Sequence, residues 1–88
     1  MIPEITILES TESCVRATWP SPLGLGDYTA TLKFLPGRDE RGVDGGRCHY
    51  LWVNRGFSAR AIFIDGGWEK LPTDEEWAAL EYLLRDRN

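Results

Sequence analysis

The chain has one histidine and two cysteines, which are the side chains best suited to nucleophilic catalysis. Such chemistry needs a nucleophile within hydrogen-bond reach of a base. Cys48 and His49 are adjacent, and adjacent residues of a β-strand point to opposite faces, so a strand here separates the two side chains. Cys14 lies far away along the sequence. We therefore expect structural thiols and no catalytic residue, with a small enzyme that uses His49 as an alternative.

Metal sites and acid–base sites also lack their usual sequence patterns. A structural zinc site needs four ligands with paired spacing, such as two Cys-x-x-Cys units, and the chain has no such pair. The densest acidic run, Asp74 to Glu76, directly follows Thr73. Threonine followed three positions later by glutamate is a helix capping box, which explains these acids without a catalytic role. We expect no metal and no cofactor.

Alternation of apolar and polar residues predicts the strands that would position these side chains. It is clearest at 28–35, where Tyr28, Ala30 and Leu32 share one face. The pattern predicts a single domain over residues 1–88 of the α+β class, a strongly curved five- or six-stranded antiparallel meander packed against one C-terminal α-helix. The expected strands are about 4–9, 14–19, 28–35, 48–54 and 58–65, with a possible sixth strand at 68–71. The expected helix is about 74–86.

Charge and targeting signals limit where the protein is expected to act and what it is expected to bind. No apolar run reaches the roughly 18 to 20 residues of a membrane span, and the first residues lack the basic start and apolar core of a signal peptide. We expect a cytoplasmic protein without membrane contact, and therefore reduced cysteines. The net charge of −4 argues against direct nucleic-acid binding, because Lys and Arg supply most of the affinity for phosphates. Residues 33–60, however, have more basic than acidic side chains.

The predicted sheet has more large apolar residues than one helix can cover. Five strands about 4.8 Å apart span roughly 19 Å, whereas a helix with its side chains is about 10 Å across. Segments 48–54 and 58–65 are apolar on both faces. Either the sheet curls and buries its own concave side, or a partner covers the outer face. The candidate partner-binding residues are Tyr50, Trp52, Arg60 and Trp68 on that face, and Arg38, Asp39, Glu40 and Arg41 in a charged loop beside it.

These features predict a small acidic protein that is not an enzyme and acts by binding another protein, or a second copy of itself to form a dimer. Trp, Tyr and Arg are the residue types that most often anchor protein interfaces. The role would be that of an inhibitor or adaptor. A phage-type inhibitor of a nucleic-acid-processing host defence complex fits this size and charge. The main alternative is a nucleic-acid-binding module that uses the basic and aromatic middle of the chain.

Overall fold

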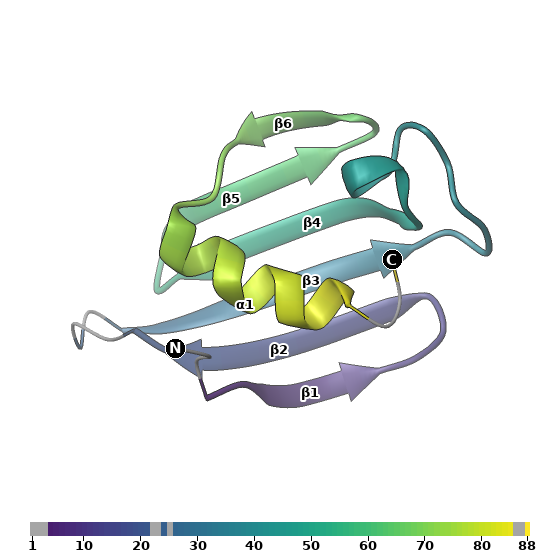
Figure 1. Cartoon of the computed structure of the whole chain (residues 1–88). Helices are drawn as coiled ribbons and strands as arrows, with labels where there is room; N and C mark the ends of the chain where they lie inside the picture. The colour runs from purple at the N-terminus through teal and green to yellow at the C-terminus, as the bar shows by residue number, and fades with distance from the viewer. Residues whose placement is uncertain (1–3, 22–23, 25, 86–87) are drawn as a thin grey trace.

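The computed structural model describes residues 4–21, 24, 26–85 and 88. Its strands form one antiparallel sheet in which every strand lies beside its neighbour in the sequence (Figure 1). One α-helix follows the last strand, and a short 3-10 helix, η1, lies in the loop before β4. The elements are β1 (Thr6–Ser10), β2 (Cys14–Pro20), β3 (Asp27–Phe34), η1 (Val43–Gly45), β4 (Cys48–Arg55), β5 (Ser58–Ile64), β6 (Gly67–Lys70) and α1 (Asp74–Leu84).

The predicted α+β meander with one C-terminal helix is confirmed, and the sixth strand is present. The sheet is curled but not closed, because the first and last strands, β1 and β6, are not neighbours. All five residues of β1 are exposed, and its pairing with β2 is irregular between Ile7 and Glu9. α1 ends at Leu84, and the predicted last helical residue, Asp86, lies outside the described residues.

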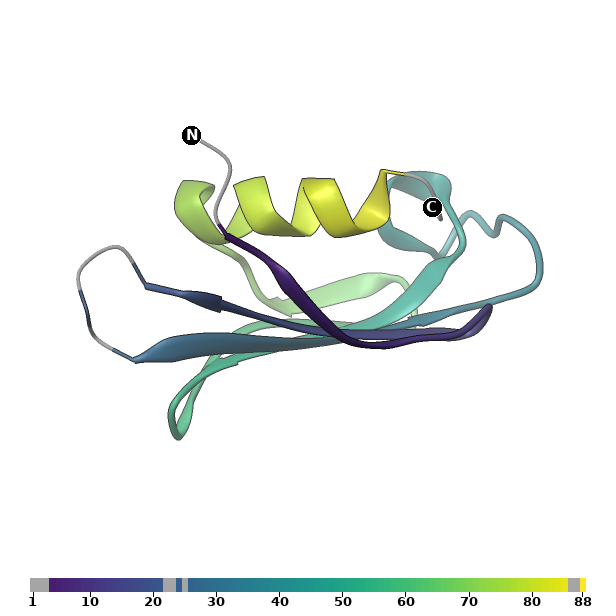
Figure 2. The same cartoon turned by 90° about the horizontal axis from the view of Figure 1, so that it is seen from below.

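α1 lies over one face of the sheet, and among the described residues no element covers the other face (Figure 2). On the covered side, alternate residues of β2 to β5 point toward the helix and are buried. This arrangement follows from the two-residue period of a strand, which places every second side chain on the same face. The buried apolar residues are Val15, Ala17, Trp19, Tyr28, Ala30, Leu32, Phe34, Val43, Cys48, Leu51, Val53, Ala61, Phe63, Ala79, Leu80, Leu83 and Leu84.

The first turn of α1 contains the predicted capping box. The Thr73 side chain accepts a hydrogen bond from the backbone N–H of Glu76, and Glu76 Oε1 accepts one from the backbone N–H of Thr73 at 2.9 Å. Glu76 is only 1% exposed, and its second oxygen, Oε2, accepts a hydrogen bond from Arg60 Nε at 3.0 Å. Both oxygens of this buried carboxylate are therefore satisfied, which removes most of the cost of burying it.

The contact between α1 and the sheet leads to a stability prediction. Leu80 is fully buried, so Leu80→Ala should lower the free energy of unfolding by about 2–5 kcal/mol through lost burial and the cavity left behind. Tyr82 is 45% exposed on the same helix and is the matched control, for which Tyr82→Ala should cost about 1 kcal/mol or less. Urea unfolding followed by tryptophan fluorescence measures both values, and equal losses would contradict the observed packing.

Candidate functional site

The face of the sheet that α1 does not cover is the largest feature that core packing leaves unexplained. We call its side chains on β2 to β5 the open face. They are the alternate residues that point away from the core, and strand register places them side by side. The open face comprises Cys14, Arg16, Thr18, Pro20, Asp27, Thr29, Thr31, Lys33, Tyr50, Trp52, Asn54, Ala59, Ile62 and Ile64.

Two aromatic rings on β4 form the centre of the open face. The rings of Tyr50 and Trp52 are inclined at only 19°, with centroids 6.5 Å apart. Trp52 Nε1 donates a hydrogen bond to Asn54 Oδ1 at 2.8 Å, which satisfies the indole N–H and holds the ring along the strand. Lys33 Nζ lies 5.3 Å from the centroid of the Tyr50 ring, within the range of a cation–π contact. The two rings are thus held in place before anything binds them.

Isoleucines from β5 extend this aromatic centre. Ile62 pairs with Trp52, and Ile64 pairs with Tyr50, in the antiparallel register of β4 and β5. Cross-strand pairs of aromatic and β-branched residues stabilise a sheet by about 0.2–1 kcal/mol each, so part of their role is structural. The four side chains are nevertheless half-buried in a face that no element covers among the described residues. We call Tyr50, Trp52, Ile62 and Ile64 the apolar patch.

The surroundings of the apolar patch are polar and carry both signs of charge. Arg16 and Lys33 are exposed on β2 and β3, and Thr31 lies between Arg16 and Trp52 in the strand register. Asp27, at the start of β3, is exposed and follows the alternation of Thr29 and Thr31. Glu9 of β1 pairs with Arg16 and therefore shares its face. The cations of the open face are thus accompanied by carboxylates.

Two predicted members of this surface lie on the opposite side of the sheet. Arg60 follows the alternation of Ile62, so an outward direction was expected, but its guanidinium binds Glu76 under α1. The register of β4 and β5 shifts at this point, where Val53 pairs with Ala61 and Asn54 pairs with Ala59. This bulge leaves Arg60 as an extra residue, and bulges redirect side chains in this way. The predicted position of Arg60 on the outer face is wrong for that reason.

Trp68 is also on the covered side, so its predicted position on the outer face is wrong. It pairs with Phe63, a core residue, and directly opposite residues share a face. Its ring meets that of Phe63 at 5.1 Å and that of Trp77 on α1 at 5.9 Å, both edge to face. Trp68 therefore extends the core beneath the start of the helix.

The charged loop between β3 and β4 folds toward the side of α1 and not beside the open face (Figure 2). Val43 of η1 is buried, and Asn88 links η1 to β4 by donating to the Val43 carbonyl and accepting from the Cys48 N–H, each at 2.8 Å. Gly46 has no room for a Cβ atom because the Asn88 side chain fills that space. The predicted position of this loop beside the outer face is therefore wrong, and with it the grouping of Arg38, Asp39, Glu40 and Arg41 with the aromatic residues.

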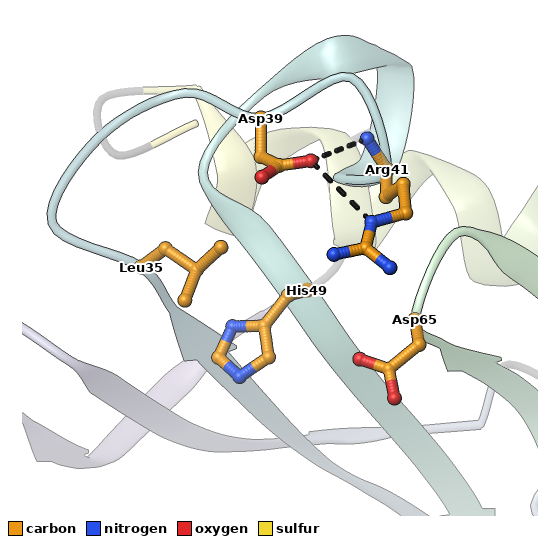
Figure 3. Close-up of a pocket in the computed structure, with 5 residues that line it drawn as sticks. All are labelled: Leu35, Asp39, Arg41, His49 and Asp65. Atoms are coloured by element: carbon orange, nitrogen blue, oxygen red, sulfur yellow. Dashed lines mark hydrogen bonds and ion pairs between the residues drawn. The ribbon is translucent and has the colours of Figure 1, made fainter.

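A pocket of about 140 Å³ lies between this loop and the start of β4 (Figure 3). It is lined by Leu35, Asp39, Arg41, His49 and Asp65. Asp39 Oδ1 accepts a hydrogen bond from the backbone N–H of Arg41 at 2.8 Å and lies 3.9 Å from Arg41 Nε. His49 Nδ1 is buried without a hydrogen-bond partner. The lining offers the His49 imidazole and two carboxylates, and no hydroxyl or thiol nucleophile beside them.

The two thiols have different surroundings, and neither joins His49 in the pocket. Cys48 is fully buried in the core, and burial raises the pKa of its thiol to about 11. Its Sγ donates to the Tyr50 carbonyl at 3.3 Å. Cys14 is partly exposed on the open face, where it pairs with Lys33. Within the described part of the chain, no group of three or more His, Cys, Asp or Glu residues is placed to hold a metal ion.

Comparison of the chain with protein-family models, with curated proteins and with solved structures finds no match in any of the three. Among the described residues, no helix has the length and apolar character needed to cross a membrane.

The difference between the thiols predicts selective labelling. With native protein at pH 8, a thiol reagent such as Ellman's reagent should react quickly with Cys14 only, and Cys48 should react after unfolding. The buried, protonated Cys48 thiol contributes to the free energy of unfolding. This contribution is fully present below about pH 9 and is lost as the pH rises through about 11, because the pKa of the thiol is higher in the folded protein than in the unfolded chain. Cys14→Ala is the control and should abolish the fast reaction. Two fast thiols in the native protein would contradict the buried position of Cys48.

Proposed function

We propose that this protein is a non-enzymatic binding protein whose open face contacts another protein. The observation that carries the proposal is the fixed pair Tyr50 and Trp52 at the centre of an uncovered sheet face. Aromatic side chains held in position lose little conformational freedom on binding, so more of their contact energy appears as affinity. Tryptophan and tyrosine are also the residue types most enriched among interface hot spots.

The composition of the open face supports a protein partner. Its centre is apolar and its surroundings are hydroxyl groups and charged side chains of both signs, the arrangement of a specific protein interface with an apolar core and a polar rim. Arg16 pairs with Glu9 of β1, whereas Lys33 lies beside the Tyr50 ring, so a carboxylate of the partner would complement Lys33 at the edge of the aromatic pair.

The mode of action follows from the distribution of charge. The open face has exposed cations at Arg16 and Lys33, and the first turn of α1, on the other side of the sheet, has the acids Asp74 and Glu75. Opposite charges on different surfaces suit an adaptor, and a bound partner would also be blocked sterically, as by an inhibitor. Phage origin and a host defence target stay predictions from size and charge.

A nucleic-acid-binding module is the second candidate, favoured by one observation. An aromatic pair with a lysine beside it, on the open face of a sheet, is an arrangement that stacks unpaired bases in single-stranded nucleic acids. Two cations on the face provide few phosphate contacts, and the net charge repels the polyanion. We therefore place this candidate second.

Direct binding measurements separate the two candidates. Fluorescein-labelled single-stranded and duplex oligonucleotides, mixed with the purified protein at about 50 mM salt, should show no change in anisotropy, because phosphate contacts are too few even where salt screening is weak. Micromolar binding that weakens with added salt and disappears in Trp52→Ala would overturn the protein-binding proposal in favour of the second candidate.

Replacement of the central tryptophan tests the proposal itself. After affinity purification and mass spectrometry identify a partner, calorimetry with both purified proteins should show that Trp52→Ala weakens binding about 30-fold, the loss typical of a hot-spot residue. Lys33→Glu, at an exposed position, should also weaken binding without unfolding the protein. Tyr82→Ala on α1 is the matched control and should bind normally. Unchanged affinity in both open-face variants would reject this surface, and a dimer in light scattering would point to a second copy.

A further inference from the structure

The turn between β4 and β5 has a residue that the fold does not require. Gly56 and Phe57 are the two turn residues between Arg55 and Ser58, which pair with each other. Gly56 has φ of +60° and Phe57 has no positive φ, as in a type II′ turn, where glycine occupies the first central position. Small polar residues such as Asn, Asp or Ser usually follow that glycine. A phenylalanine there is not explained by turn chemistry.

Phe57 is also not explained by packing. Its relative exposure is 111%, the highest among the exposed large hydrophobic residues of the described chain. A fully exposed phenyl ring contributes nothing to the core and adds apolar surface in contact with water. A residue of this kind on a short, well-defined turn has the properties of an interface anchor, because the turn fixes its position before binding.

The turn lies on the side of the open face. Figure 2 shows that the β4–β5 hairpin bends away from α1, so that its tip projects beyond the sheet on the uncovered side. The hairpin also contains the apolar patch, since Trp52 and Ile62 belong to its two strands. A partner seated on the open face would therefore meet the tip of the hairpin at one end of the interface.

The charges near the tip favour a protein over a polyanion or an anionic membrane. The Arg55 guanidinium lies 5.7 Å from the centroid of the Tyr28 ring, and Nη1 donates to the Tyr28 hydroxyl at 3.4 Å. That hydroxyl donates in turn to Glu75 Oε1 at 3.3 Å. Arg55, the cation next to the turn, is therefore bound within the protein and shares the Tyr28 hydroxyl with the Glu75 carboxylate. Arg55 is for this reason poorly placed to bind a phosphate group at this end of the hairpin.

We propose that Phe57 inserts into an apolar pocket of the protein that binds the open face. The inference rests on the proposed function and adds the chemistry of the partner, which has a cavity for one aromatic ring and a carboxylate that faces Lys33. A second copy is not the inferred partner, because the pocket described next to His49 is lined mainly by charged groups and does not suit a phenyl ring.

Site-specific photocrosslinking tests this inference. The photoreactive residue p-benzoylphenylalanine replaces Phe57, Lys33 on the open face, or Tyr82 on α1 as a control, each in the full chain within cells that make the protein. We expect positions 57 and 33 to crosslink to the same protein and position 82 to give no crosslink to it. Crosslinks from 33 without 57 would overturn the inference but leave the proposed function intact. Crosslinks from 57 alone, to nucleic acid, or to a second copy would overturn it, and no crosslink from either position would overturn both.

For the second test, the partner identified by crosslinking is purified, and its affinity for variants of this chain is measured. Phe57→Ser should weaken binding about 30-fold, whereas Phe57→Leu, which keeps part of the apolar side chain, should lose less. Ser suits this turn position, so the thermal midpoint of Phe57→Ser should equal that of the wild type or exceed it. Binding of Phe57→Ser within about twofold of the wild type, with the same thermal midpoint, would show that Phe57 is not an anchor.

Discussion

The packing of a single helix against a wider sheet determines the rest of this structure. α1 has 11 residues, and the sheet has six strands. Strands about 4.8 Å apart make such a sheet roughly 24 Å wide between its outer strands, while the helix is about 10 Å across. Curvature of the sheet lets α1 bury side chains from the central strands on one side. The other side then has no second layer among the described residues, and its apolar residues stay half-buried.

Irregularities in strand register decide which side chains belong to each layer. Between β3 and β4 the register leaves His49 as an extra residue, with Cys48 in the core and Tyr50 on the open face. Between β4 and β5 it leaves Arg60, which turns to the buried carboxylate of Glu76. One bulge thus brings a histidine to a pocket, and another supplies the counter-ion for a helix cap. Both depend on a local departure from strict alternation.

The sequence allowed prediction of the elements, the capping box and the central aromatic pair, because these depend on local patterns. Alternation alone puts Tyr50 and Trp52 on one face and Leu51 on the other, as observed. The positions of Arg60 and Trp68 required the strand register, which no local pattern in the chain indicates. The path of the loop before β4 depends on Asn88, which is distant in sequence and close in space. The full exposure of the Phe57 ring is a property of the folded shape, which no local pattern indicates.

The edges of the sheet explain why its broad face is the more suitable surface for recognition. Strand addition, in which a partner extends a sheet through backbone hydrogen bonds, needs a long and regular edge. β6 has four residues, and β1 has five with a break in register at Leu8. Short or bulged edge strands are the features by which natural proteins prevent uncontrolled sheet growth and aggregation. The exposed Ile7 and Leu8 therefore lie on a strand that is poorly suited to edge-to-edge aggregation.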